Sequence, residues 1–362
     1  MKKIGILTFH RAVNYGALLQ AYALVETLQE IGANAEVIDY KNDKIEKSYY
    51  TRRGLTNSLK SMLRNVYLFP IQQKRNKAFQ RTLEQYLRLS KTSYTKQTIG
   101  ETEKIYDFII TGSDQVWNLP CTNGDKTYFL DFINEPKKKK SYAASFGKIK
   151  GFEKEYKQYL ELIKTFSAIS VREENGKHFL QDNNIEENIR VDIDPVFLLN
   201  RKKWMEFEKT PDFDDYILVY SVNLPNGILK YAREQAKKLG KEMIIVTLRN
   251  KKIKLLKNEK NYSCCTPNEF VGLINHASLV VTNSFHGTAF SIILHKNFVV
   301  VRNSTSSAAM DNSRLDNILN IMQLDNRFSD RVKLNENINY TEVDRIIRDL
   351  RENSLDYLRL LV

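Results

Sequence analysis

The chain has 362 residues, of which 42% are hydrophobic and 27% charged, with 14 Gly and 7 Pro. This composition excludes a disordered or fibrous chain, and the length exceeds what one hydrophobic core usually fills, so two domains are expected. The formal net charge of +13 at pH 7 fits three kinds of partner, which are nucleic acid, an anionic substrate and an anionic membrane leaflet.

Much of the positive charge lies in short clusters: Lys137 to Lys140; Lys251, Lys252 and Lys254; and Lys74, Arg75, Lys77 and Arg81. A solvated basic surface explains such clusters as well as a binding face does. The sequence has no zinc-finger spacing, RNP signature or heptad-linked basic region. We therefore expect no nucleic acid partner.

Cysteine and histidine usage indicates neither a disulfide framework nor a metal site. Of the three cysteines, Cys264 and Cys265 are adjacent, a spacing that rarely closes a bridge, and the five histidines are scattered. The N-terminal MKKIGILTFH lacks the apolar core and cleavage site of a signal peptide, and no stretch approaches the length of a membrane span. We expect a cytoplasmic protein with no bound metal or cofactor.

The first part of the chain reads as a βαβ unit. KKIGILTF is a predicted strand, the loop HRAVNYG follows, residues 17–32 have helical periodicity ending at Gly32, and AEVIDY is a second strand. Such a unit is normally parallel and right-handed. Residues from about 44 to 100 are rich in Lys, Arg, Tyr and Gln with helical spacing, which predicts a helical insertion between sheet strands.

A strand at YDFIITG resumes the sheet, and three short apolar runs follow in KSYAASFG, FSAISVRE and IRVDIDPVFLL. In an open α/β sheet the loops at the carboxyl ends of the strands carry the ligand site. The segments GSDQ, SFG, VRE and DPV are therefore candidate rim segments. Residues 201–215 contain few apolar residues and a Pro, which predicts a linker.

A second series begins with the strand YILVYSV and the helical segment at 227–240. Thr266, Pro267 and Glu269 form the pattern of a capping box with Pro in the first helical turn. The strand SLVVTN, a helix opened by the loop residues Ser284 to His286, the strand NFVVVR and an amphipathic terminal helix complete the series. We predict two doubly wound, Rossmann-like α/β domains, residues 1–200 and 201–362, that face a cleft.

The segment TNSFHGTAF is the main candidate for chemistry, because a strand ends at Thr282 and a helix begins near Gly287. Ser284, His286 and the backbone N–H groups of Gly287 and Thr288 then lie at a helix N-terminus, which favours a bound anion. His286 adds a donor that titrates close to neutral pH. The structural alternative is a histidine that only caps or packs.

Arg172 follows a predicted strand in VREENG. A guanidinium there would bind a carboxylate or phosphate with two parallel hydrogen bonds. Pairing with Glu173 or Glu174 on the surface is the equally simple alternative.

Two further loops are candidates for binding sugar hydroxyls. In GSDQVWN we consider Ser113, Asp114, Gln115 and Trp117, with Asp114 orienting a hydroxyl and Trp117 stacking on a sugar ring. Alternatively Asp114 caps the next turn and Trp117 fills the core. In HRAVNYG, Gly16 permits close approach of the backbone to a ligand, and Asn14 and Tyr15 offer hydrogen bonds.

Several familiar enzyme classes are not supported, since the sequence lacks a GxSxG elbow, a P-loop, HExxH and a kinase signature.

The chain resembles the polysaccharide pyruvyl transferase family over residues 1 to about 330. The motifs that carry the resemblance are, in order, NYGALLQAYAL, GSDQVWN, YFLDF, SYAASFG, SVREENG, DPVFLL and TNSFHGTAFSI. The order of the motifs, rather than any one of them, carries the resemblance.

The resemblance implies a GT-B-like pair of Rossmann-type domains, with the acceptor side in the first domain and the donor side in the second. It implies transfer of the pyruvyl unit of phosphoenolpyruvate, a co-substrate, to two hydroxyls of a sugar, galactose in our prediction, in a bacterial surface polysaccharide or its lipid-linked precursor. By the SVRE and SFHG matches, Arg172 and His286 take the places of the family Arg and His at the donor site, with His286 as acid or phosphate ligand. Asp114 is our hypothetical base.

The chain departs from the family pattern at Ser284, where better-known members have an Arg two residues before the His. A donor-binding cation must then come from elsewhere. Lys296, Arg302 and Arg314 are candidates, and we favour Arg314.

Two other functions stay open at this level. One is a nucleotide-sugar glycosyltransferase on the same scaffold, because fold alone does not fix function. The other is a basic module that docks on anionic lipid or glycan, and such peripheral membrane contact is also compatible with catalysis.

Overall fold

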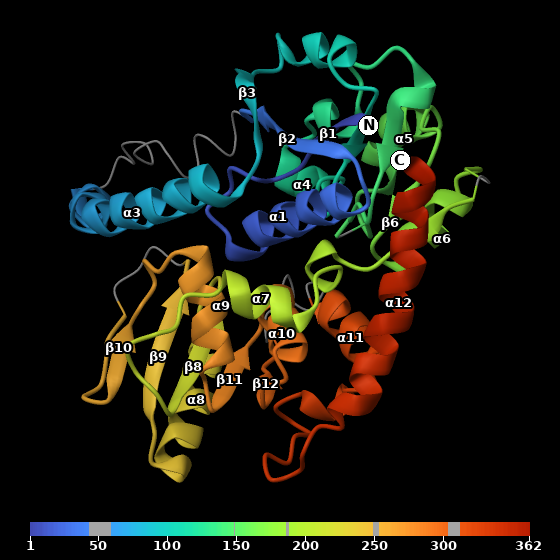
Figure 1. The fold of residues 1–362 in the computed structure, drawn as a ribbon. Helices are drawn as coiled ribbons and strands as arrows, with labels where there is room; N and C mark the ends of the chain where they lie inside the picture. Colours follow the sequence, from blue (N-terminus) through green and yellow to red (C-terminus); the bar gives the residue numbers. More distant parts are fainter. Residues whose placement is uncertain (43–58, 148, 186–187, 249–252, 303–311) are drawn as a thin grey trace.

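The computed structural model describes residues 1–42, 59–147, 149–185, 188–248, 253–302 and 312–362. Two five-stranded parallel sheets, one from each half of the chain, form the two bodies that lie one above the other in Figure 1. This arrangement confirms the α/β prediction with one open sheet in each half.

The first sheet has the strand order β3-β2-β1-β4-β5, and all its pairs are parallel. Its strands are β1 (Lys3–Leu7), β2 (Asn34–Tyr40), β3 (Leu89–Tyr94), β4 (Phe108–Thr111) and β5 (Lys139–Ser141). The pair β6 (Ser170–Val171) and β7 (Arg190–Val191) continues it through isolated bridges. Among the described residues, the α-helices of this half are α1 (Tyr15–Glu30), α3 (Leu59–Tyr86), α4 (Leu119–Thr122), α5 (Glu153–Ile163) and α6 (Glu174–Gln181).

The second sheet has the order β10-β9-β8-β11-β12, again with parallel pairs. Its strands are β8 (Tyr216–Ser221), β9 (Glu242–Thr247), β10 (Glu259–Asn261), β11 (Leu279–Thr282) and β12 (Phe298–Val300). The helices are α7 (Arg201–Phe207), α8 (Asn226–Leu239), α9 (Pro267–Asn275), α10 (Phe285–Ile293), α11 (Asn312–Ile321) and α12 (Tyr340–Leu361). Every residue of β8 and β11 is buried, as expected of apolar strands covered on both faces.

Both sheets share one topological property that locates a ligand site. In the first sheet β1 lies between β2 and β4, and in the second sheet β8 lies between β9 and β11. The chain adds strands on one side of β1 or β8 and then crosses to the other side, so each sheet has a switch point between β1 and β4 or between β8 and β11. Ligands of open α/β sheets bind at the carboxyl ends of the strands at such a switch point.

The predicted helical insertion at 44–100 was too long. Residues 43–58 lie outside the described part of the chain, α3 covers Leu59–Tyr86, and Leu89–Tyr94 is a strand that pairs with β2 at the edge of the first sheet. Because β3 is an edge strand, its exposed positions carry Lys and Thr, which hid the strand pattern.

The predicted linker at 201–215 was wrong in its first half, where α7 forms. Trp204 is fully buried and its ring lies 4.8 Å from that of Phe290 in α10 and 5.9 Å from that of Tyr22 in α1. One large apolar residue therefore makes α7 part of the core, although most of its neighbours are charged.

Aromatic side chains join the two halves. The rings of Tyr15 in α1 and Phe270 in α9 stack at a centroid distance of 4.3 Å. One buried core cluster accordingly contains residues of both sheets and of the helices between them. We refer to Tyr15, Trp204, Phe270 and Phe290 as the aromatic seam.

Helix α12 runs along both bodies and ends beside the first sheet (Figure 1). Near its end, Ser354 Oγ donates to Asp192 Oδ1 at 2.9 Å and Tyr357 Oη donates to Ser141 O at 2.9 Å. The last helix therefore belongs in space partly to the first half, although we assigned it to the domain 201–362.

Candidate active site

The candidate site lies where the two switch points face each other. After β1, Asn14 caps α1 and its side-chain oxygen accepts from Gly16 N at 3.0 Å. After β11, Ser284 caps α10 and its Oγ accepts from Gly287 N at 3.5 Å. Two capped helix N-termini from opposite halves thus approach the same region.

The close contact between these termini is made by Gly16 and His286. A Cβ atom placed on Gly16 would lie 1.9 Å from His286 Nδ1 and 2.2 Å from its Cγ, a distance that no real side chain tolerates. Gly16 was predicted to let the backbone approach a ligand. Instead its missing side chain makes room for the imidazole of the other half.

Asp194 is the centre of the polar network. Its Oδ2 accepts from Arg172 Nη1 at 2.8 Å and from Ser113 Oγ at 3.3 Å, and it lies 3.5 Å from His286 Nε2. Its Oδ1 accepts from Val196 N at 3.1 Å. Segments that follow β4, β6 and β11 therefore meet at one carboxylate.

Burial and charge act in opposite directions on this carboxylate. Burial alone would raise the pKa of Asp194, but His286 and Arg172, together with the Val196 N–H, more than offset it and hold the pKa well below the usual range. Burial would likewise lower the pKa of Arg172, but Glu173, Asp194 and Asp114 outweigh it and raise that pKa. The pair is therefore ionised throughout the physiological range.

Arg172 is more constrained than either sequence interpretation assumed. It is buried rather than on the surface, and its Nε donates to Glu173 Oε1 at 2.8 Å. The guanidinium also lies over the ring of Phe285, 4.8 Å from its centroid. Glu173 is fixed in turn by Ser145 Oγ, which donates to the same oxygen at 2.9 Å.

Two buried nitrogen atoms at the centre have no hydrogen-bond partner among the described residues. They are Arg172 Nη2 and His286 Nε2. His286 Nε2 faces Asp194 Oδ2 at 3.5 Å, so Arg172 Nη2 is the donor for which the described residues offer no acceptor. Since buried polar groups are normally satisfied, this guanidinium nitrogen points to a ligand that carries acceptor oxygens.

The N-terminus of α10 adds donors, although not those that the sequence predicted. Gly287 N is capped by Ser284 Oγ, and Thr288 N donates to Ser284 O at 3.0 Å. Thr288 is itself buried, with its hydroxyl on the same carbonyl. Phe285 and His286 are the first two residues of α10, whose N–H groups have no acceptor within the helix, and no bond from them to another described residue is found, so an anion would meet these two.

The loop after β4 places Ser113 and Asp114 at the site, whereas Gln115 contacts Asn118. Ser113 is buried and contacts Asp194 as above. Asp114 has a left-handed backbone, with φ 74°, and its Oδ1 accepts from Gln115 N at 2.8 Å. Gln115 Oε1 accepts from Asn118 Nδ2 at 2.7 Å. Asp114 also lies close enough to Arg172 to raise its pKa.

Two predicted acceptor residues instead belong to the core. Trp117 is fully buried, donates from Nε1 to Tyr128 O at 3.1 Å and stacks on Phe129, so no sugar can reach its ring. Tyr15 is buried in the aromatic seam, and its hydroxyl donates to Cys265 O at 3.2 Å. Asn14 is used as a cap, and it remains partly exposed.

The candidate replacements for the cation missing at Ser284 differ in position. Lys296 lies beyond the far end of α10 and donates to Asn275 O at 2.6 Å, and Arg302 pairs with Asp316 at 2.6 Å, so both are engaged elsewhere. Arg314 lies in the first turn of α11, which packs against α10. The preceding residues 303–311 lie outside the described residues.

Asp194 and Ser145 were not predicted as site residues, and Glu173 was predicted only as a surface partner of Arg172. The only available signal was the placement of DPV, VRE and SFG at the carboxyl ends of strands, which identified segments without indicating which side chain faces inward.

Within the described ranges, no group of three or more His, Cys, Asp or Glu residues could hold a metal ion. No described helix is both long and apolar enough to span a bilayer.

Comparison with known proteins gives a family and a fold. The sequence profile described as polysaccharide pyruvyl transferase matches residues 14–305. No curated protein sequence matches the chain.

Among solved structures, the chain is similar to a UDP-GlcNAc 2-epimerase from Methanocaldococcus jannaschii, with a TM-score of 0.50 and 17% identity over 97% of this chain and 99% of that one. It is also similar to a putative UDP-N-acetylglucosamine 2-epimerase from Listeria monocytogenes, with a TM-score of 0.52 and 11% identity over 99% of this chain and 90% of that one. At such identities the similarity concerns the fold alone, and it confirms the prediction of a GT-B-like pair of α/β domains.

Proposed function

Because the chain belongs to the polysaccharide pyruvyl transferase family, we propose that it transfers the pyruvyl unit of phosphoenolpyruvate to two hydroxyls of a sugar, forming a cyclic ketal. The sugar, galactose in our proposal, belongs to a bacterial surface polysaccharide or its polyprenyl-linked precursor. The observation that carries this proposal is the buried, unpartnered Arg172 Nη2, which lies with His286 beside the α10 N-terminus.

These groups suit a donor with a carboxylate and a phosphate. A guanidinium binds planar oxyanions well, and a helix N-terminus favours negative charge. Phe285, beneath the Arg172 guanidinium, restricts its rotation. We assign Arg314 as the second cation, because α11 packs beside the helix that carries His286.

The reaction requires one proton to reach carbon and two to leave oxygen. An acid protonates the methylene carbon of phosphoenolpyruvate, one sugar oxygen bonds to the adjacent carbon, and a base takes that hydroxyl's proton. The second sugar oxygen then bonds to the same carbon, the bond to the phosphate oxygen breaks, and phosphate leaves with the remaining proton. A positioned acid or base typically contributes about 100-fold to 10,000-fold.

We assign His286 as the acid, because the Asp194 carboxylate beside it stabilises an imidazolium and Gly16 fixes the ring. Asp114 is the candidate base for the sugar hydroxyl, since it lies in the loop next to the cationic centre. Neither residue needs a metal ion or cofactor for these roles.

The test is to incubate the purified chain with phosphoenolpyruvate and a panel of nitrophenyl and lipid-linked sugars, and to measure phosphate release and the mass of the product. Phosphate release only when donor and acceptor are both present, with the acceptor gaining a pyruvyl unit, is the expected result. Binding of a nucleoside diphosphate sugar with no response to phosphoenolpyruvate would overturn the proposal and favour a glycosyltransferase.

The role of His286 is tested by His286→Asn. If His286 acts as the acid and does not bind the donor, the variant should still bind phosphoenolpyruvate, but its kcat should fall by about 100-fold or more. Loss of donor binding in a folded variant would instead make His286 a phosphate ligand.

A further inference from the structure

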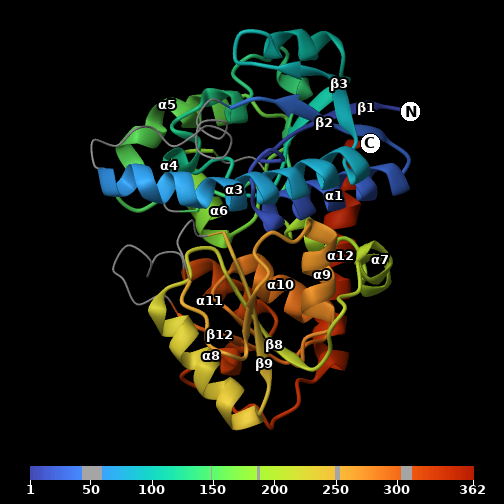
Figure 2. The same cartoon turned by 90° about the vertical axis from the view of Figure 1, so that its left-hand side faces the viewer.

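Helix α1 reaches the candidate site at two points. It lies on the side of the first sheet that faces the second body (Figure 2), and its first turn places Gly16 against the imidazole of His286. Gln20 follows one turn later, and residues four apart share a face of a helix. The side chain of Gln20 is fully buried and contacts Thr8, the residue that follows β1.

A chain of hydrogen bonds leads from Gln20 to the carboxylate of Asp194. Gln20 Nε2 donates to Thr8 Oγ1 at 2.9 Å, and Thr8 Oγ1 donates to Ser113 O at 2.8 Å. Ser113 Oγ then donates to Asp194 Oδ2 at 3.3 Å. None of the four residues is more than 2% exposed. We refer to Gln20, Thr8 and Ser113 as the buried link.

The donors and acceptors leave the buried link one orientation. The atom of Gln20 that faces Thr8 also contacts Ala17 O at 2.9 Å, so it is the amide nitrogen, which can only donate. The backbone oxygen of Ser113 can only accept, so the Thr8 hydroxyl must direct its proton at Ser113. Thr8 also packs closely on Gly112, where an added Cβ atom would lie 3.2 Å from Thr8 Cβ. The loop after β4 is therefore fixed against β1 and α1.

Packing alone does not account for a buried amide at Gln20. Its Oε1 has no hydrogen-bond partner among the described residues, and a buried unpaired oxygen costs stability. An apolar side chain of similar length would avoid that cost. What the amide contributes is its nitrogen, which orients the Thr8 hydroxyl.

The imidazole of His286 has one neighbour at each end of this arrangement. Its Nδ1 faces Gly16 of α1, and its Nε2 lies 3.5 Å from Asp194 Oδ2. Helix α1 thus acts on both sides of the ring, directly through Gly16 and indirectly through the buried link.

We propose that Gln20 and Thr8 are positioning residues that hold Asp194, by way of the loop after β4, at its distance from the imidazole of His286. Their effect on turnover rests on the proposed function, whereas the environment of the ring can be measured without any substrate.

The environment of the ring is tested by NMR on protein with isotope-labelled histidine. The signal of His286 is identified by its absence in His286→Asn. It should shift in Thr8→Val, which keeps the shape of the side chain without the hydroxyl, and stay near its original position in Thr8→Ser. Gln20→Met, which keeps the length and loses both hydrogen bonds, should shift it in the same way. An unchanged His286 signal in either folded variant overturns the proposal, whether or not the protein modifies a sugar.

Turnover gives a second readout. In Thr8→Val and Gln20→Met we expect kcat to fall about tenfold, with KM for phosphoenolpyruvate changed by less than about twofold, because the acid is misaligned while Arg172 still binds the donor. In a Ser113→Ala background the Thr8→Val loss should disappear, since the link acts through the Ser113 hydroxyl. A loss that persists in full in that background would refute the link. If the unsubstituted protein pyruvylates no sugar of the panel, the proposed function fails, while the NMR measurement still decides the positioning role.

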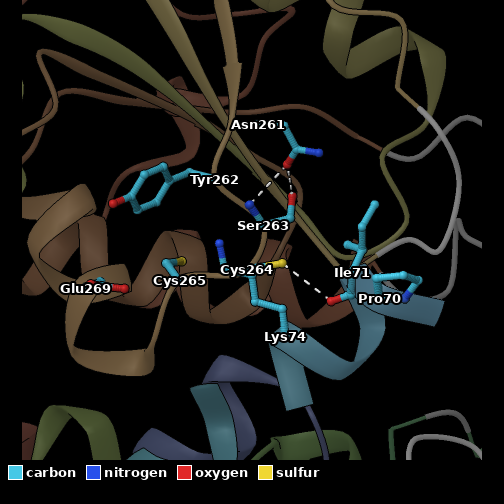
Figure 3. Close-up of a pocket in the computed structure, with 9 residues that line it drawn as sticks. All are labelled: Pro70, Ile71, Lys74, Asn261, Tyr262, Ser263, Cys264, Cys265 and Glu269. Atoms are coloured by element: carbon cyan, nitrogen blue, oxygen red, sulfur yellow. Dashed lines mark hydrogen bonds between the residues drawn. The ribbon is translucent and has the colours of Figure 1, made fainter. Parts of the chain in front are cut away.

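Ser263→Ala is the matched control for lost stability. Ser263 Oγ likewise accepts one hydrogen bond, from Thr247 N at 3.0 Å, and donates another, to Asn261 (Figure 3). Ser263 lines a cavity of about 560 Å³ that shares no lining residue with the network around Asp194. Urea unfolding should show that Thr8→Val and Ser263→Ala both lose stability, but only Thr8→Val should lower kcat and move the His286 signal. Equal losses of kcat in both would mean that the buried link acts only through folding.

Discussion

Replacing Asp194 with Asn is the sharpest test of the site, because it removes one charge and almost no volume. The side chain is fully buried, and its loss leaves Arg172 and His286 without their shared carboxylate. Removing one partner of a buried ion pair costs about 3–5 kcal/mol of the free energy of unfolding, and we expect the lower end because Glu173 still pairs with Arg172.

The effect on catalysis should exceed the effect on folding. Without Asp194 the imidazolium of His286 loses its stabilising charge, so we expect kcat for pyruvyl transfer to fall by about 100-fold to 10,000-fold. Steady-state kinetics with phosphate release, on protein shown to be folded by circular dichroism, measures this. A folded Asp194→Asn variant with nearly unchanged kcat/KM would refute the central role of the carboxylate.

Asp192→Asn is the matched control. Asp192 is also buried, and it accepts from Ser170 Oγ at 2.6 Å and from Ser354 Oγ at 2.9 Å, away from the candidate site. We expect this variant to lose stability but to keep kcat. Equal losses of kcat in both variants would mean that Asp194 acts only through folding.

The pH dependence of stability gives an independent readout. The folded pKa of Asp194 lies below the roughly 3.9 of an unfolded aspartate, so its contribution is fully present above that unfolded value and is lost as pH falls through the folded pKa. The stability gap between the unsubstituted protein and Asp194→Asn should therefore be constant above about pH 5 and narrow below about pH 4. Urea unfolding at several pH values measures it, and a gap that widens in acid would contradict the assignment.

Three further predictions concern other parts of the site and surface. Gly16→Ala should reduce kcat by about tenfold or more, because the new methyl group displaces the imidazole of His286, whereas Gly227→Ala, which meets nothing within 4 Å, should leave turnover unchanged. Arg172→Lys should raise KM for phosphoenolpyruvate by about tenfold or more, since an ammonium cannot replace the planar fork; calorimetry with the donor alone checks this, and unchanged affinity would count against donor binding. If the acceptor is lipid-linked, the protein should sediment with vesicles of anionic phospholipid at low salt and be released as salt rises; no binding at low salt would exclude this peripheral contact.

Local sequence signals correctly predicted helix caps and buried strands, because these features depend on neighbouring residues. The capping box of Thr266 and Glu269 is present in the structure, and Ser284 caps α10 where the strand-to-helix turn was predicted. β8 and β11 were recognisable because buried parallel strands are continuous apolar runs. By contrast, the exposed edge strand β3 and the helix around Trp204 lacked such a signature.

The functional contacts were not predictable for a different reason. Asp194 acquires its role from contacts with Ser113, Arg172 and His286, and nothing in the residues around it specifies those partners. The sequence did not decide whether Trp117 and Tyr15 bind a ligand or pack in the core, because an aromatic residue at a strand end can do either. Only the packing of the two halves distinguishes these cases.

The aromatic seam affects the kinetics of turnover. Separating the halves would expose the large rings of Tyr15, Phe270 and Trp204, at about 1.5–3 kcal/mol each, a total comparable with the 5–15 kcal/mol that keeps a typical domain folded. Wide opening would therefore cost several kcal/mol, and we expect substrates to enter and leave while the seam stays closed. Raising solvent viscosity, which slows large hinge motions, should consequently leave kcat almost unchanged.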